Sequence, residues 1–134
     1  MSGITALLLF AAWTLALMLT YVNYRVMLIF TGRKPADSWT RGRPNEDPGF
    51  IVRAQHAHLN CVENLPVFGA IVLSAYALGR PGVADAFGVW VLVMRLAQSA
   101  VHLIGVSPAL VFIRGNLFTI QVVLFLVMIW QLLH

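Results

Sequence analysis

Charge is what this chain has least of, and that scarcity decides its class. Charged residues fill 10% of the 134 positions, hydrophobic residues fill 60%, and the mean hydropathy is +0.82. A soluble domain carries roughly 25% charged residues. A chain this short cannot enclose so much apolar surface in its own interior. The sequence therefore predicts a single domain, residues 1–134, whose solvent is the lipid bilayer.

Cysteine and clustered basic residues are also scarce. The one cysteine, Cys61, cannot form an intrachain disulfide, so no oxidised framework is expected. A small buried thiol is the simpler interpretation of Cys61, and a catalytic thiol is the alternative. The net charge is +4, but the arginines are scattered through apolar segments. No basic stripe with interleaved aromatic residues is present, so we expect no nucleic-acid partner.

Long hydrophobic runs are abundant, and four of them can span a bilayer, which takes about 20 helical residues. They cover approximately residues 4–30, 51–78, 84–106 and 109–133. The runs are continuous rather than alternating, so helices are expected and not barrel strands. The first run lacks a basic start and a clean cleavage site, so it is predicted to be a transmembrane helix and not a signal peptide.

The links between these runs predict topology and orientation. Residues 79–82 and 105–108 are short turns built from glycine and proline, so consecutive helices are expected to be antiparallel in an up-down bundle. The first link, residues 31–50, is long and carries four basic residues. The positive-inside rule places this link in the cytoplasm and both termini outside. A bacterial inner membrane and the endoplasmic reticulum both fit.

Ionisable side chains gather at one level of the predicted bundle, where such residues are usually paired, interior-facing and functional. In the second span, Arg53, His56, Asn60 and Glu63 fall within about 80° of a helical wheel. Residues of the other spans reach the same cytoplasmic half: Arg25, Arg95, Gln98, Ser99, His102, Arg114 and Gln121. Arginines outnumber the single carboxylate, Glu63. Such a cationic pocket suits a guest with a carboxylate, thiol or phosphate group.

Simpler interpretations of these side chains stay open. Arg25 and Arg53 lie close enough to helix ends to extend to lipid headgroups. Arg95 lies too deep for that, so we expect either a structural ion pair with Glu63 or a functional role. Three histidines resemble a metal set by count, but no cysteine or carboxylate completes it, and no metal is expected.

Proline inside the second span offers another interpretation of its asparagines. Pro66 cannot donate to the carbonyl of Val62, so it is expected to kink or loosen the helix. Asn60 and Asn64 would then serve the freed backbone groups instead of a ligand.

The run over residues 53–68, R-A-Q-H-A-H-L-N-C-V-E-N-L-P-V-F, resembles the signature of the MAPEG family, the membrane-associated proteins of eicosanoid and glutathione metabolism. The matching features are an opening arginine, then A-H-x-N-x-x-E, then an apolar-P-x-F run. Four spans, a long first link and arginines in spans three and four extend the resemblance over the chain. It implies a four-helix bundle that assembles as a homotrimer, with glutathione between neighbouring subunits.

The resemblance also assigns roles to residues. Asn60 and Glu63 match the glutathione-binding asparagine and glutamate of the family. Arg114 resembles the arginine that stabilises the glutathione thiolate, so it is the predicted catalytic residue. The predicted glutathione-binding set is Arg53, His56, Asn60, Glu63, Arg95 and His102.

Two functions are expected from this resemblance. The first is an integral membrane glutathione transferase or peroxidase, with glutathione as co-substrate and a lipophilic electrophile or lipid hydroperoxide as substrate. The alternative is a non-catalytic lipid-binding or accessory subunit, because the family contains such a member and this chain departs from its enzymes. His56 stands where arginine is usual, and His102 and Phe118 stand where tyrosine is found. A transporter is not favoured, because no inverted repeat is present.

Overall fold

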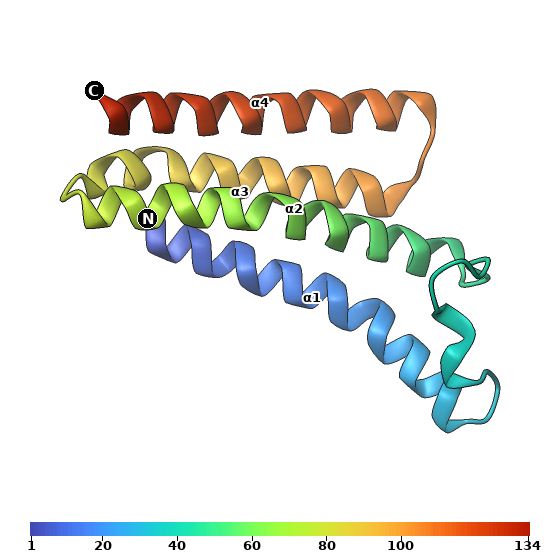
Figure 1. The fold of residues 1–134 in the computed structure, drawn as a ribbon. Helices are drawn as coiled ribbons and strands as arrows, with labels where there is room; N and C mark the ends of the chain where they lie inside the picture. Colours follow the sequence, from blue (N-terminus) through green and yellow to red (C-terminus); the bar gives the residue numbers. More distant parts are fainter.

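The computed structural model describes all of residues 1–134 as four long helices and one short 3-10 helix (Figure 1). The elements are α1 (Gly3–Phe30), η1 (Ala36–Trp39), α2 (Gly49–Ala77), α3 (Pro81–Ile104) and α4 (Pro108–Leu133). All four long helices are long and apolar enough to cross a membrane, and there is no strand. The predicted all-helical fold is confirmed. α3 and α4 begin earlier than expected, because a proline, which is favourable in the first turn of a helix, begins each of them.

The helices run alternately up and down, with both termini at one end of the bundle and the 31–50 link at the other (Figure 1). α1 packs on α2 and α3, whereas α4 packs chiefly on α3 and contacts α2 much less. Only Gln121, Phe125 and Met128 of α4 are buried. Most of the α4 surface is therefore left to lipid or to another protein chain.

Aromatic side chains from three helices form the centre of the apolar core. Phe68 of α2 lies between Phe10 of α1 and Phe125 of α4, with ring centroids 5.8 and 6.0 Å apart. Cys61 lies in the same core, fully buried, with its Sγ 3.8 Å from the Oγ of Ser99. Its surroundings are those of a small buried thiol.

Small residues let α1 and α3 approach closely near the end that holds the termini. A Cβ atom added to Gly88 would lie 3.2 Å from the Cβ of Ala6 and 3.2 Å from the Cα of Gly3. At the same crossing, Asp85 Oδ1 accepts hydrogen bonds from the backbone N–H of Gly3 (2.7 Å) and the hydroxyl of Tyr76 (2.9 Å). The carboxylate thus satisfies one of the free N–H groups at the start of α1.

Pro66 does not end α2, which continues to Ala77. Asn64 Nδ2 donates to the carbonyl oxygen of Asn60 at 2.8 Å, one turn back along its own helix. The expectation that Asn64 serves the carbonyl of Val62 is therefore wrong, because its side chain reaches the preceding turn.

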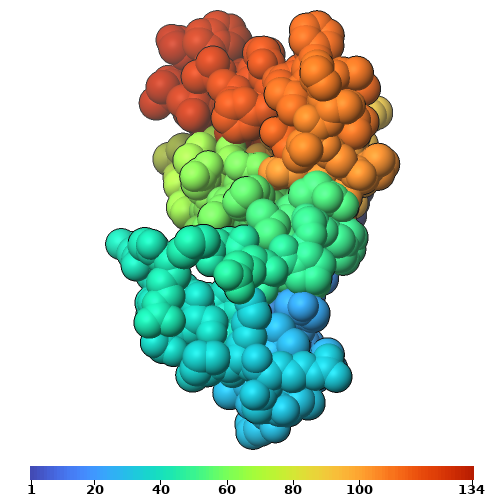
Figure 2. Space-filling model, turned by 90° about the vertical axis from the view of Figure 1, so that its right-hand side faces the viewer, coloured from blue at the N-terminus to red at the C-terminus, as the bar shows by residue number.

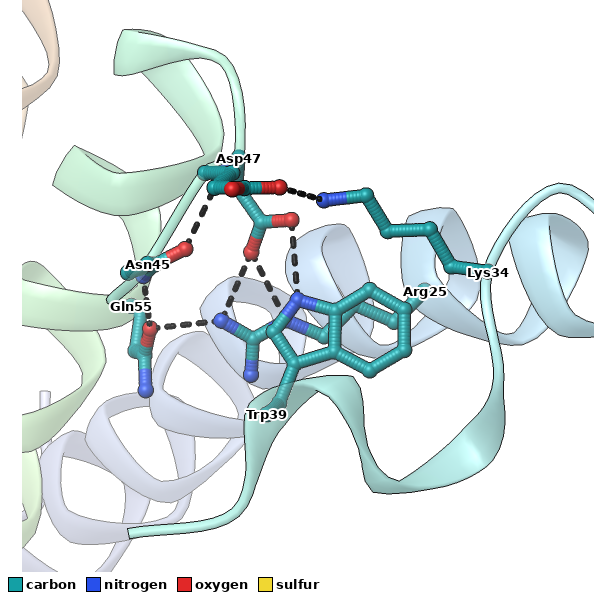
Figure 3. A network of polar contacts seen from close by, with 7 residues as sticks. Arg25, Lys34, Trp39, Asn45, Asp47 and Gln55 are labelled. Carbon is teal, nitrogen blue, oxygen red and sulfur yellow. Dashed lines mark hydrogen bonds and ion pairs between the residues drawn. The ribbon is translucent and has the colours of Figure 1, made fainter. Parts of the chain in front are cut away.

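The 31–50 link is folded around a buried carboxylate (Figure 3). Asp47 accepts hydrogen bonds from Arg25 Nε and Trp39 Nε1, both at 2.9 Å, and Arg25 Nη2 lies 2.8 Å from it. Arg25 Nη2 also donates to Gln55 Oε1 at 2.7 Å. These contacts join α1, the link and α2. Arg25 therefore has a carboxylate partner in the link, which the sequence pattern did not assign to it.

We expect Gly88→Val to lower the free energy of unfolding by about 1–3 kcal/mol, because the new side chain has no space between α1 and α3. Gly82→Val is the matched control, since a Cβ there meets no atom within 4 Å. Thermal unfolding in detergent, followed by circular dichroism, measures both variants. Equal losses would contradict the close contact of the two helices.

Candidate functional site

Five of the seven predicted site residues line one open cavity of about 470 Å³ between α2, α3 and α4. They are His56, Asn60, Glu63, His102 and Arg114. A second hollow of about 380 Å³ shares Asn60, Glu63 and Arg114 and adds Asn64, Gln98 and Phe118. The two hollows together are called the α2–α4 cavity below. The 31–50 link lies on the α1 side of this end, with the first turns of α2 between it and α4 (Figure 2).

Arg53 opens the polar face of α2 but is not among the side chains that line the cavity. Its Nε donates to the carbonyl oxygen of Leu103 at 2.9 Å. That carbonyl belongs to the last turn of α3, where backbone acceptors have no partner in their own helix. Arg53 thus holds the start of α2 against the end of α3.

Two histidines face each other across α2 and α3. His102 is 5% exposed, and its ring centroid lies 6.1 Å from that of His56. Asn60 Nδ2 is 3.4 Å from His102 Nδ1. A hydrogen bond here requires the tautomer of His102 in which Nδ1 accepts. This contact fixes the Asn60 side chain at the cavity wall.

Arg95 is fully buried, and of the two alternatives for it, the ion pair with Glu63 is not formed. Its Nη1 donates to Gln98 Oε1, and its guanidinium lies 5.5 Å from the ring centroid of Phe10 in α1. Nε and Nη2 of Arg95 have no hydrogen-bond partner. Glu63 is exposed, whereas Arg95 is fully buried, so the two side chains lie in different surroundings. The Glu63 carboxylate is left without an ion-pair partner at the cavity.

Gln98 connects the buried arginine to the cavity. Its Oε1 accepts from Arg95 Nη1, and its Nε2 donates to the backbone carbonyl of Arg114 at 3.5 Å. Arg114 Nη1 is buried and has no hydrogen-bond partner. The sequence offered a signal for Gln98 in its spacing of three residues from Arg95, but it gave no indication of the contact with α4.

The α2–α4 cavity is lined by side chains of opposite charge that can form hydrogen bonds with one bound molecule. Glu63 supplies a carboxylate acceptor, Arg114 supplies a guanidinium with a free donor, and Asn60 supplies an amide. Such a set can hold a polar molecule that carries both an ammonium and anionic groups. Phe118, Val111 and Leu59 give the same space apolar walls, so an apolar molecule can lie beside the polar one.

We expect Gln98→Leu to lower the free energy of unfolding by about 1–3 kcal/mol, because it removes the hydrogen-bond acceptor of a buried guanidinium. Arg95→Met keeps a long side chain and removes the buried charge, so it should cost less or stabilise the fold. In the double variant the loss caused by Gln98→Leu should largely disappear. Additive losses in thermal unfolding would contradict the coupling.

Comparison with known proteins bears directly on this cavity. The sequence model of the MAPEG family matches residues 3–134, which include all four helices and every residue of the cavity. The resemblance seen in the second span therefore extends over essentially the whole chain. A search of the curated proteins finds no significant match.

Proposed function

We propose that this chain, which belongs to the MAPEG family, is an integral membrane glutathione-dependent transferase or peroxidase. Its substrates would be lipophilic electrophiles or lipid hydroperoxides. The observation that supports this most directly is the α2–α4 cavity, where Asn60, Glu63 and Arg114 meet. These are the residues to which the family resemblance gives glutathione binding and thiolate stabilisation.

In the proposed complex, the charges of glutathione match those of the cavity. The Glu63 carboxylate would pair with the ammonium group of glutathione, and the Asn60 amide would hydrogen-bond its peptide backbone. Arg114 would place its guanidinium beside the sulfur. A nearby cation favours the thiolate over the thiol and so lowers the pKa of the glutathione sulfur. A tenfold gain in the ratio of thiolate to thiol corresponds to about 1.4 kcal/mol of such stabilisation.

The chemistry then needs only a thiolate and a second substrate held beside it. In the transferase reaction, the sulfur forms a bond to the electrophilic carbon, and the leaving group departs with its electron pair. In the peroxidase reaction, the sulfur attacks the terminal oxygen, the O–O bond breaks, and an alcohol leaves after taking up a proton. A second glutathione converts the sulfenic acid into a disulfide and water. Binding both partners in one cavity supplies the orientation for these steps.

The non-catalytic lipid-binding or accessory function is the competing proposal, and three side chains support it. His56 and His102 replace an arginine and a tyrosine of the family enzymes, which removes one permanent charge and one hydroxyl from the cavity. Phe118 adds an apolar wall instead of another hydroxyl. A cavity altered in this way favours an apolar guest over a tripeptide.

We also propose that the chain assembles as a homotrimer in which a neighbouring subunit closes the cavity. The support is the large exposed surface of α4, of which only Gln121, Phe125 and Met128 are buried within the chain. Val111 and Arg114 of this helix line the cavity. A neighbouring helix there would cover apolar surface and offer further polar partners.

We expect Arg114→Ala to lower kcat for glutathione conjugation by about 100-fold or more, because the thiolate loses its stabilising cation. Conjugation of a lipophilic aryl halide and reduction of a lipid hydroperoxide by purified protein measure the effect. Arg33→Ala is the control, since it removes an exposed arginine that makes no ion pair.

Activity of Arg114→Ala equal to that of the parent would contradict the role of Arg114. Calorimetric titration of the parent protein with glutathione separates the two functions. Sub-millimolar binding supports the glutathione-dependent function, whereas absence of binding supports the lipid-binding alternative.

Chemical crosslinking in mild detergent is expected to give a band at three times the mass of the chain. A monomer as the sole species would contradict the homotrimer.

A further inference from the structure

The 31–50 link has a defined fold, held by side-chain contacts, and is not an irregular connection. Within it, the side chain of Asp47 is 1% exposed and accepts hydrogen bonds from Arg25 of α1 and Trp39 of η1 (Figure 3). The Arg25 guanidinium also lies 5.3 Å from the Trp39 ring centroid. Contacts from both flanking helices therefore fix the shape of the surface above Asp47.

A polar hollow of about 230 Å³ opens in this surface. Three arginines contribute to its lining, namely Arg25, Arg41 and Arg43, and no carboxylate does. Asn45 and Gln55 add two amides. A concave surface with several guanidinium groups and no acid favours an anion.

The ion pairs of the link leave part of this charge uncompensated. Asp47 balances Arg25, and Asp37 balances Arg43 at 2.7 Å. Arg41 has no ion-pair partner. Gln55 uses its Oε1 to accept from Arg25 and Asn45, so its Nε2 stays free to donate. An anion in the hollow would meet one unpaired guanidinium and further N–H donors.

The neighbouring side chains indicate the level at which the hollow lies. Phe30, the last residue of α1, is 87% exposed, and Phe50, in the first turn of α2, is 49% exposed. Both flank the 31–50 link. The link joins two helices that are long and apolar enough to cross a membrane, so it lies at a membrane surface. A hollow in this link is therefore within reach of lipid headgroup phosphates.

We propose that this hollow binds the phosphate of an anionic phospholipid headgroup, with Arg41 as the principal contact. The site is separate from the α2–α4 cavity, which shares no lining residue with it. The lipid would fasten the link, and with it the ends of α1 and α2, to one leaflet of the membrane.

The experiment measures lipid binding to the purified full-length protein in mild detergent by native mass spectrometry. The probes are phosphatidylglycerol, phosphatidylcholine of the same acyl chains, and inorganic phosphate. Arg41→Gln is the test variant. Arg33→Gln is the matched control, because it removes the same charge from the same link but lies outside the hollow. Both arginines are exposed, so both variants are expected to fold.

We expect phosphatidylglycerol to bind at least five-fold more tightly than phosphatidylcholine. Arg41→Gln should weaken the binding of phosphatidylglycerol about five-fold, since one arginine near the lipid surface is worth about this factor, and Arg33→Gln less than two-fold. Equal losses in the two variants would overturn the site in favour of diffuse attraction. No preference over phosphatidylcholine, or displacement of the lipid by millimolar inorganic phosphate, would overturn the lipid assignment.

Discussion

The structure depends on one constraint: a guanidinium inside a lipid-embedded bundle has to find its partners within the protein. Arg95 meets this constraint only in part, through Gln98 and the face of Phe10. Gln98 in turn contacts the backbone of Arg114, so the need of one buried charge fixes α3 against α4. One wall of the α2–α4 cavity is therefore connected, through Gln98, to the buried Arg95 in the centre of the bundle.

The polar side chains of the 31–50 link and of the α2–α4 cavity lie toward one end of the molecule, in two separate places. Arg25 and Asp47 belong to the α1 side, where the 31–50 link closes over them. Glu63 and Arg114 belong to the α4 side, which the link leaves uncovered. The division follows from packing, because α2 lies between these two sides and turns a different polar face to each.

Much of the fold could be predicted from hydrophobic length and from turn residues, because the bilayer fixes both. The positions of polar residues along each helix also predicted the end of the bundle at which they gather. The hydrogen-bond and ion-pair partners of these residues could not be predicted in this way. A helical wheel gives the faces of one helix but not its rotation against a neighbour, so it offered Glu63 as one possible partner of Arg95 and did not indicate Gln98 or Phe10. Asp47 was missed as the partner of Arg25 because a residue in a link has no periodicity to reveal its direction. Glutathione binding and the trimer stay predictions, since both depend on molecules beyond a single chain.

The uneven anchoring of α4 has a consequence for how molecules reach the guanidinium of Arg114. The three buried side chains of α4 all lie between residues 121 and 128, and none of residues 108–120 is buried. The half of α4 that carries Arg114 is thus the half that packs less against the rest of the chain. Where no neighbouring subunit covers it, that half faces the membrane, and a hydrophobic compound diffusing in the plane of the membrane would meet it from the side. It could approach the polar groups laterally, without ever dissolving in water.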